Sequence, residues 1–356
     1  MGELLIRENE LMVEEEEEAE AAVRVWKCVF GYVEMAVVKC AVELRIFDVI
    51  EKHGKPMTLD ELSAVLACSS LFLHRIMRFL AHQKFLKERF AGDGVKSYDL
   101  TPLSRFFTRD GERSMKGLLL LESSPVMLAP WHYLSGRVRN GPAAFEAAHG
   151  EDVWEYASKH PEHSELISDA MACDARVSVP AIIDGCAGLF DGINTVVDVG
   201  GADGTALGLL VKAFPSIKGF NFDLPHVISV APEINGVEHV CGDMFEAVPK
   251  AELALIKWVL HDWSDYECVQ ILSKCREAVL DADKGKVIIV EAVIREDDDS
   301  EFKHVGLMLD MIMMAHTNSG KERTQEEWGS ILTKAGFSRF TVKPIHAVQS
   351  VIVAYP

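Results

Sequence analysis

From about residue 193 to its end, the sequence alternates short apolar runs with helical patterns, and this alternation restricts the fold more than any other feature. The runs are INTVVDVGG, IKGFNFDLP, VEHVCGDMF, LALIKWVL and KVIIVEAVI, and segments such as ADGTALGLLVKAF and DYECVQILSKCREAVL separate them. Apolar strands separated by helices are typical of a parallel sheet that is covered on both faces. The last segment, FTVKPIHAVQSVIVAYP, predicts two strands at an antiparallel edge. We therefore expect an α/β fold with a Rossmann-like, mostly parallel sheet.

The preceding part of the chain has a helical rhythm with few strand signals. Apolar residues follow three-and-four spacing in VWKCVFGYVEMAVVKCAVELRIFDVIEKHG, which ends at Gly54. Thr58 and Glu61 have the spacing of a capping box that begins the next helix. SSLFLHRIMRFLAHQKFL predicts another helix, and KSYDLTPLSRFF predicts a short strand that leads to a helix. This order of elements predicts a mainly helical, winged-helix-like domain.

These rhythms, together with a run of glutamates near the start, divide the chain into three expected parts. They are an acidic N-terminal tail (1–20), the helical domain (21–190) and the sheet domain (191–356). Apolar helices such as MAVVKCAVEL in the helical domain are consistent with a buried interface between two subunits.

Charge and cysteine usage exclude several classes of protein. The formal net charge of −19 argues against a nucleic-acid partner, because such proteins need clustered lysine and arginine. No apolar run reaches the roughly 18–20 residues that span a bilayer, and no signal peptide is visible, so we expect no membrane partner. The eight cysteines are scattered, with no pair or cluster at zinc spacing. We therefore expect reduced thiols, a cytoplasmic location and no metal site.

The glycine turn after the first strand of the sheet domain indicates what kind of ligand the sheet binds. The segment VVDVGGADG has small residues at alternate positions, Gly200, Ala202 and Gly204. It does not match the G-x-G-x-x-G spacing of dinucleotide folds, which counts against a nicotinamide-dependent oxidoreductase. Alternating small residues allow close approach of a ligand without a diphosphate, such as an amino acid joined to a nucleoside.

Acidic residues follow the next two strands at the same predicted edge of the sheet. Asp223 could accept hydrogen bonds from two ribose hydroxyls, and Asp243 could accept one from an adenine amino group. Met244 and Phe245 offer apolar contact to the adenine ring. Open α/β sheets bind ligands at the carboxyl ends of their strands. The combination favours S-adenosyl-L-methionine over NAD.

Six motifs occur in an order that is similar to one enzyme family. They are VVDVGGADG, FDLPHVI, GDMFEAVP, LIKWVLHDWSD, GKVIIVEAVI and SGKERT. In this order they resemble the plant O-methyltransferases of the caffeate, flavonoid and benzylisoquinoline-alkaloid type. The resemblance implies that the N-terminal half is a dimerisation domain that also carries substrate-pocket helices. It implies a homodimer that converts S-adenosyl-L-methionine to S-adenosyl-L-homocysteine. Two positions depart from the family, which usually has glycine where Ala202 and Ser319 stand.

His261 in LIKWVLHDWSD is the candidate catalytic base. The apolar strand 253–260 is expected to deliver it to the carboxyl edge of the sheet, and Ser264 then caps the next helix with Glu267. A phenol with a pKa near ~10 needs a base, and a histidine with an ordinary pKa near ~6.5 is suited to that role. By resemblance, Glu291 and Glu322 orient the histidine. Glu291 is also unusual in itself, because a carboxylate within an apolar strand is rare without a partner.

The resemblance assigns roles to further residues. It places Gly200, Leu224 and Lys257 beside the cofactor and gives Asp262 a part in orienting the acceptor. It implies that Met171 and Met313 hold the aromatic acceptor between them, although periodicity alone would make both core residues.

The sequence thus predicts a metal-independent O-methyltransferase that acts on a phenolic hydroxyl of a plant secondary metabolite. A flavonoid or phenolic alkaloid is favoured, and a hydroxyindole or a simple phenylpropanoid is the alternative. A different class of protein stays open: a winged-helix regulator with a vestigial cofactor domain. That alternative rests on the basic residues His74, Arg75, Arg78, His82 and Lys84 in the helical domain.

Overall fold

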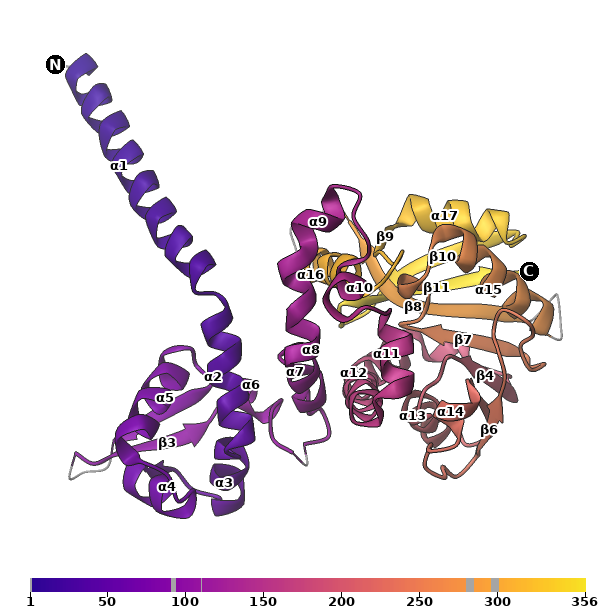
Figure 1. The fold of residues 1–356 in the computed structure, drawn as a ribbon, viewed down its shortest axis with the longest axis horizontal. Helices are drawn as coiled ribbons and strands as arrows, with labels where there is room; N and C mark the ends of the chain where they lie inside the picture. The colour runs from indigo at the N-terminus through magenta and orange to yellow at the C-terminus, as the bar shows by residue number, and fades with distance from the viewer. Residues whose placement is uncertain (1, 91–93, 110, 280–284, 296–300) are drawn as a thin grey trace. The chain divides into compact units, whose positions relative to one another are not determined.

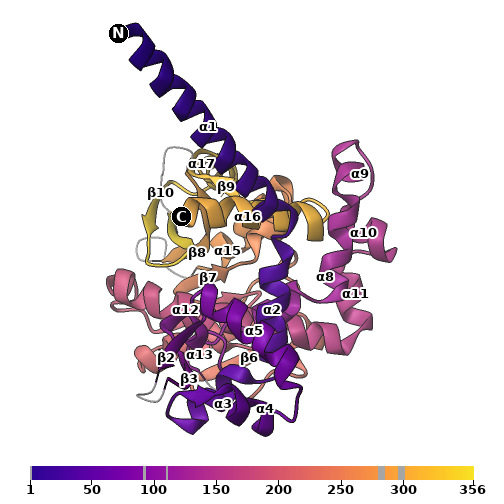
Figure 2. The same ribbon diagram turned by 90° about the vertical axis from the view of Figure 1, so that its left-hand side faces the viewer.

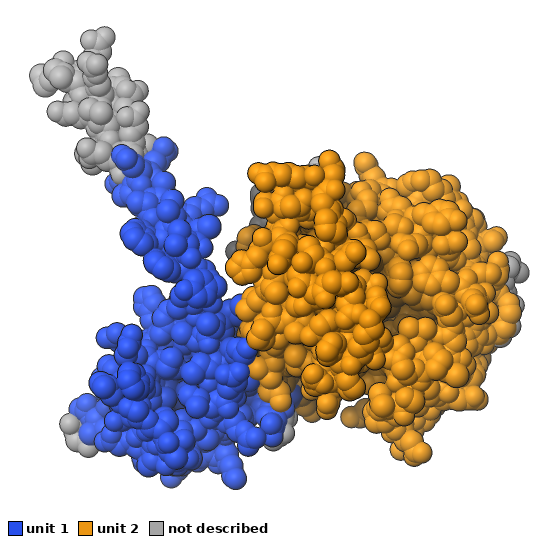
Figure 3. Space-filling view, viewed as in Figure 1, with its two compact units in different colours: residues 1–111 blue, residues 112–356 orange. Residues whose placement is uncertain are grey.

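The computed structural model describes residues 2–90, 94–109, 111–279, 285–295 and 301–356 of the chain. It forms two compact units, Met1–Gly111 and Glu112–Pro356, which Figure 3 colours separately. The boundary between the units along the chain thus follows residue 111, whereas the change of rhythm in the sequence suggested a boundary at 190. The reason is that the long helix α12 (Pro161–Cys186) packs on α13 (Thr205–Ala213) of the sheet domain and also on α7 (Lys116–Glu122).

Unit 1 consists of a long first helix, which extends away from the rest of the unit, and shorter helices around a small antiparallel sheet with the strand order β1-β3-β2 (Figures 1 and 2). Its elements are α1 (Gly2–Val29), α2 (Tyr32–Glu43), α3 (Ile46–His53), β1 (Met57–Thr58), α4 (Leu59–Val65), α5 (Ser70–His82), β2 (Leu86–Phe90), β3 (Lys96–Leu100) and α6 (Pro102–Arg105). The Thr58 side chain accepts the Glu61 N–H and the Glu61 side chain accepts the Thr58 N–H, so the predicted capping box is confirmed. The winged-helix-like arrangement is confirmed as well.

The first long helical stretch of unit 1 is divided into three helices. α1 ends just before Phe30 and Gly31, and α2 ends just before Leu44 and Arg45. Arg45 has a φ of 58°, a left-handed conformation that a continuing helix cannot contain. Among the described residues no single helix has the length and apolar character to cross a bilayer. The pair α4 and α5, bent by 118°, passes that test when both helices are taken together.

Unit 2 contains a mixed sheet with the strand order β10-β11-β8-β7-β4-β5-β6, and β9 pairs with the end of β8. The strands are β4 (Thr195–Val199), β5 (Lys218–Asp223), β6 (Val237–Cys241), β7 (Leu253–Lys257), β8 (Lys286–Ile294), β9 (Arg323–Thr324), β10 (Arg339–Pro344) and β11 (Gln349–Tyr355). The pairs from β8 to β6 are parallel, whereas β11 runs antiparallel to both β8 and β10. The predicted parallel sheet with an antiparallel C-terminal edge is confirmed.

Helices cover both faces of this sheet (Figure 1). Besides α7, α12 and α13, unit 2 contains α8 (Pro125–Leu128), η1 (Ala129–Tyr133), α9 (Leu134–Val138), α10 (Ala144–His149), α11 (Val153–Lys159), η2 (Ala187–Leu189), α14 (Pro225–Ile228), η3 (Leu260–Asp262), α15 (Asp265–Ala278), α16 (Glu301–His316) and α17 (Gln325–Lys334). In β7, Ala254 and Ile256 belong to a core shared with α15 and α17, while Leu253 and Leu255 belong to one shared with α12 and α13. This alternation is why the apolar run of β7 has no polar face.

Candidate active site

The glycine turn lies between β4 and α13, at the carboxyl edge of the parallel strands. Gly200 has a φ of +73°, and a Cβ there would lie 2.7 Å from a methyl carbon of Val259, so only glycine fits. Ala202 also has a positive φ of 49°, a left-handed conformation that glycine adopts without the steric cost that a Cβ brings. The N–H of Ala202 donates to Asp223 Oδ2 at 2.8 Å.

The strand-end acids lie where the sequence places them relative to the strands. Asp223 is the last residue of β5, and its other oxygen accepts the N–H of Leu224 at 2.7 Å. Burial raises the pKa of Asp223. Asp243 follows β6, and its carboxylate accepts the N–H of Phe245 at 2.8 Å. Met244 and Phe245 are partly buried against the core shared with α15.

Two buried polar groups beside the turn have atoms without a hydrogen-bond partner among the described residues. They are Oδ2 of Asp198 on β4 and Oδ1 of Asn221 on β5. Burial raises the pKa of Asp198 to about 7, although the nearby positive charge of Lys257 opposes that rise. Buried polar atoms in native proteins nearly always have a partner. A turn with unpaired polar atoms at its base therefore suits a polar ligand.

Lys257 ends β7 and is held by a buried ion pair that the sequence did not predict. Its Nζ lies 2.5 Å from Asp174 Oδ2, with both side chains only 6% exposed. Asp174 comes from α12 and also accepts hydrogen bonds from Gln349 Nε2 at 2.7 Å and Ser178 Oγ at 3.1 Å. The pair thus ties α12 to the end of β7.

His261 lies in the 3₁₀ turn η3, and the predicted strand 253–260 is three residues too long. β7 ends at Lys257, and Trp258 has a φ of 51°, which turns the chain away from the sheet. Glu291 Oε1 then accepts the N–H groups of Val259 at 3.0 Å and Leu260 at 2.9 Å. A carboxylate on the neighbouring strand β8 therefore replaces the strand partner that these two amides would otherwise have.

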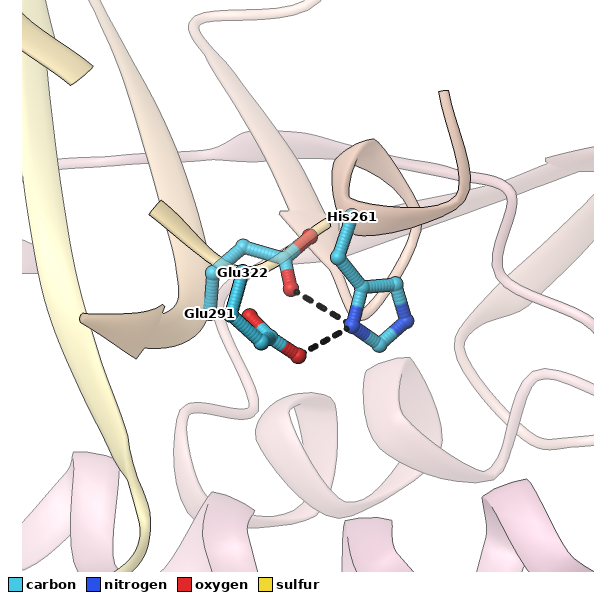
Figure 4. A group of neighbouring side chains, drawn as sticks. All are labelled: His261, Glu291 and Glu322. Atoms are coloured by element: carbon cyan, nitrogen blue, oxygen red, sulfur yellow. Dashed lines mark hydrogen bonds and ion pairs between the residues drawn. The ribbon is translucent and has the colours of Figure 1, made fainter. Parts of the chain in front are cut away.

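Both glutamates approach the same nitrogen of the His261 ring (Figure 4). Nδ1 lies 2.9 Å from Glu322 Oε1 and 3.5 Å from Glu291 Oε2, and Nε2 points away from both carboxylates. His261 is 5% exposed, Glu322 is 3% exposed and Glu291 is fully buried. A carboxylate accepts hydrogen bonds, so the 2.9 Å contact assigns the proton to Nδ1.

The charges of this group strongly affect its protonation. Burial opposes a charged imidazole, but Glu291, Asp262 and Glu322 outweigh that effect and raise the pKa of His261 to about 10. Burial raises the pKa of Glu291 to about 7. The free protein therefore holds a proton at His261 more firmly than an isolated imidazole would.

Asp262 is the acid nearest to the other ring nitrogen. Its Oδ1 lies 3.8 Å from His261 Nε2, and burial raises the pKa of Asp262 to about 6. Ligand atoms of His261, Glu291 and Glu322 all lie within 4.8 Å of one another, a spacing that a metal ion could also use. Glu291 Oε1 already accepts two backbone N–H groups, so it is not free to ligate a metal, and few ligand atoms of the three side chains remain.

Arg323 supports the His261 turn, and sequence reasoning missed it. This fully buried side chain donates to the carbonyl oxygens of Leu260 at 3.0 Å and Trp263 at 2.6 Å, and to Asp265 at 2.9 Å. Its neighbour Lys321 donates its backbone N–H to the His261 carbonyl at 2.8 Å. The signal in the sequence is weak: Arg323 directly follows the predicted carboxylate Glu322 in KERT, a segment that is otherwise typical of a charged helix start.

The two methionines expected to hold the acceptor come from different helices of unit 2. Met171 on α12 packs against an apolar cluster that contains Met127 and Phe145. Met313 on α16 is 8% exposed, and its carbonyl accepts the hydroxyl of Thr317 at 2.8 Å. That hydroxyl in turn accepts the N–H of Gly320, where a Cβ would lie 2.4 Å from the His261 carbonyl oxygen. Met313 is thus linked through this short series of contacts to the His261 turn.

Comparisons with known proteins identify the family to which the chain belongs. Residues 131–338 match the model of the O-methyltransferase domain, and residues 26–110 match that of the O-methyltransferase dimerisation domain. The chain is 51% identical to acetylserotonin O-methyltransferase of Arabidopsis thaliana over 96% of this chain and 94% of the relative. It is 40% identical to (RS)-norcoclaurine 6-O-methyltransferase of Thalictrum flavum subsp. glaucum, over 94% and 96%. A methyltransferase in calicheamicin biosynthesis, solved in its SAH-bound form, has a TM-score of 0.79 at 25% identity and covers 95% and 98%.

Proposed function

Because the chain belongs to the O-methyltransferase family, we propose that it moves a methyl group from S-adenosyl-L-methionine to a phenolic hydroxyl, with His261 as the base. The observation that carries this proposal is the contact of His261 Nδ1 with Glu322 at 2.9 Å, which makes Nε2 the nitrogen that can exchange a proton with the acceptor. We infer that the acceptor is a plant secondary metabolite. The relative named for acetylserotonin makes a hydroxyindole the first acceptor to test, beside flavonoids and phenolic alkaloids.

The residues around the glycine turn fit S-adenosyl-L-methionine. Gly200 allows the tight left-handed turn beside Val259, and the unpaired oxygens of Asp198 and Asn221 suit an amino-acid portion with its ammonium group. Asp223 and Leu224 would contact the ribose side, and Asp243, Met244 and Phe245 the adenine. Lys257 would lie beside the adenosyl end. When bound, the cofactor supplies a methyl group on a positively charged sulfur, and the product is S-adenosyl-L-homocysteine.

The side chains of the His261 group have distinct parts in the proposed reaction. Glu322 accepts the Nδ1 proton and fixes the ring tautomer, and Glu291 stabilises the imidazolium that forms when Nε2 takes the phenol proton. Glu291 also fixes the backbone of the turn through Val259 and Leu260. Asp262, beside Nε2, would orient the acceptor hydroxyl, and Met171 and Met313 would hold its aromatic ring.

The test is transfer of labelled methyl groups to a panel of hydroxyindoles, flavonoids, phenolic alkaloids and phenylpropanoids. Wild type is compared with His261→Gln and with the control His346→Gln, because His346 is exposed in the turn between β10 and β11. Loss of general-base catalysis lowers kcat by about 10²–10⁴. We expect that loss in His261→Gln alone, with unchanged S-adenosyl-L-homocysteine affinity by calorimetry. Equal turnover in all three proteins would exclude His261 as the base.

We also propose that the reaction needs no metal ion. The His261 Nδ1 that would ligate a metal is engaged with Glu322, and the family chemistry displaces the methyl group without a Lewis acid. Dialysis against a chelator should leave the initial rate of methyl transfer unchanged. A loss of rate that a divalent cation restores would contradict this part of the proposal.

The same family assignment leads us to propose a homodimer formed through unit 1. A cavity of about 840 Å³ there is lined by residues of α2 and α5, including Val37, Phe72 and Phe79. Trp26 on α1 and Tyr32 at the start of α2 are 64% and 67% exposed, an unusual state for large aromatic side chains. Sedimentation should give twice the mass of one chain, 39.5 kDa, for wild type. Phe72→Glu should shift the mass toward one chain, whereas Glu326→Gln on α17 should not.

A further inference from the structure

Each of the two helices that carries a proposed acceptor methionine also carries a buried histidine. On α12, His163 precedes Met171 by eight residues, and on α16, His316 follows Met313 by three. Residues three or four apart on a helix are neighbours on one face, so His316 and Met313 face the same side of α16. His163, Ile167 and Met171 follow the i, i+4, i+8 spacing of a single stripe of α12.

Both histidines are buried and have a ring nitrogen without a partner among the described residues. His163 is 4% exposed and its Nε2 is unpaired; His316 is 3% exposed and its Nδ1 is unpaired. Aromatic side chains pack against both: Tyr156 meets His163 edge-on at 5.3 Å, and Trp131 meets His316 edge-on at 5.8 Å. The imidazoles of His149 and His160, which pack against Tyr156, also lie near His163. An unpaired polar atom in such surroundings is costly unless a ligand satisfies it.

The hydrogen bond of His316 fixes which chemistry its free nitrogen offers. Nε2 lies 2.9 Å from the carbonyl oxygen of Met127, which can only accept, so the proton is on Nε2 and Nδ1 carries a lone pair. Burial, together with the neighbouring imidazole of His163, lowers the pKa of His316 to about 4. His316 is therefore neutral at pH 7. Its Nδ1 can only accept a hydrogen bond at that pH, from an N–H or O–H donor.

We propose that His163 and His316 form a polar end of the acceptor pocket, where they bind a second hydrogen-bonding group of the acceptor, remote from the hydroxyl that is methylated. This inference rests on the proposed function, because it takes Met171 and Met313 as the walls of the pocket. His316 Nδ1 accepts an N–H or O–H of the acceptor, and His163 Nε2 meets the same group or its neighbour. The preferred acceptors are thus flat phenols that carry a second donor, such as a hydroxyindole with a free ring N–H.

The proposal is tested with pairs of acceptors that differ only in the second donor. One pair is N-acetylated 5-hydroxytryptamine and its ring N-methyl derivative; the other is a dihydroxyflavone and the corresponding monohydroxyflavone. Dissociation constants are measured by calorimetry on the full chain with S-adenosyl-L-homocysteine present. The proteins are wild type, His316→Phe, His163→Phe and the control His346→Phe, since phenylalanine keeps a ring but removes its polar atoms.

For wild type and the control, we expect the donor-bearing member of at least one pair to bind about tenfold more tightly, the effect of one buried hydrogen bond. In His316→Phe that preference should fall below about threefold. Nε2 of His163 makes no hydrogen bond within the described chain, so His163→Phe costs none there. If His316→Phe does not fold, His163→Phe therefore still tests whether the preference for the second donor falls. Equal binding of both members by wild type, or an unchanged preference in both variants, overturns the inference. Since binding is measured without turnover, failure of methyl transfer in the same proteins would count against the proposed function alone.

Discussion

Replacing Glu291 with glutamine should change the pH at which His261 loses its proton. Glu291 Oε2 lies 3.5 Å from Nδ1, and the charge of Glu291 makes the largest Coulombic contribution among the three carboxylates that raise the pKa of His261 to about 10. Glutamine has nearly the same shape, and its carbonyl oxygen can still accept the two N–H groups of Val259 and Leu260. The substitution therefore removes a charge while the turn keeps its hydrogen bonds.

The size of the change follows from the distance between the charges. At ~4 Å and an effective dielectric constant near 20, two unit charges attract by about 4 kcal/mol, which corresponds to about 3 pH units. With its oxygen held by the two backbone N–H groups, the glutamine turns its NH2 group toward Nδ1 and retains none of this attraction, so we expect the pKa of His261 to fall by at least about 2 units. Burial raises the pKa of Glu291 to about 7, so the carboxylate is charged where wild-type His261 titrates.

The assay is the dependence of kcat/KM on pH, which reports the ionisations of the free enzyme. A base must be neutral to accept a proton, so kcat/KM should rise with pH and level off above the pKa of His261. The midpoint of this rise should lie near pH 10 for wild type and about 2 units lower for Glu291→Gln, whose plateau is also lower because a weaker base transfers the proton less readily. Glu326→Gln removes an exposed carboxylate of α17 and should leave the profile unchanged.

The result that would refute this reasoning is a midpoint in Glu291→Gln within about half a unit of the wild-type value. It would mean that the charge of Glu291 does not act on His261 in the working enzyme. The His261 resonance in an NMR titration, assigned with His261→Gln, separates a true change of pKa from a change in the rate-limiting step.

Three further changes have outcomes that the structure predicts. Arg323→Met removes the buried charged donor of the Leu260 and Trp263 carbonyl oxygens and leaves Asp265 without its guanidinium partner, so urea unfolding should show a loss of about 3 kcal/mol and kcat should fall; an unchanged midpoint contradicts this. Ala202→Gly relieves a left-handed φ and should raise the free energy of unfolding by up to ~1 kcal/mol without weakening cofactor binding. Between pH 7 and pH 5, wild type should lose about 2 kcal/mol more stability than His316→Phe, because the unfolded chain protonates this histidine before the folded chain does. Identical acid sensitivity of the two proteins would show that His316 is not held neutral.

The arrangement of the sheet could be predicted from the sequence because its signal is local. Each strand is a run of apolar residues, and the alternation with helices determines that the strands run parallel. The division of the chain was harder to predict, because α7 and α12 have the same helical rhythm as unit 1 but pack with unit 2. Helical periodicity does not report which partner a helix packs against.

The candidate site could be predicted in part for a similar reason. His261 and Glu291 stand out because each is an ionisable residue at an apolar strand or its end. The end of β7 at Lys257 could not be predicted, because it depends on a carboxylate of another strand. The Lys257–Asp174 pair joins residues 83 positions apart, and neither residue type indicates its partner. His163 and His316 become notable only once burial shows their nitrogens to be unpaired.

The two oxygens of Glu291 have consequences for how this enzyme could change. One oxygen ends a strand and shapes the turn, while the other faces the ring of the proposed base. A substitution there that alters the chemistry also deprives two buried amides of their acceptor. Substitutions on the helices that carry the proposed acceptor residues are thus a better route to new acceptors than substitutions of Glu291. A change of Glu291 affects the backbone of the turn and the proposed base together.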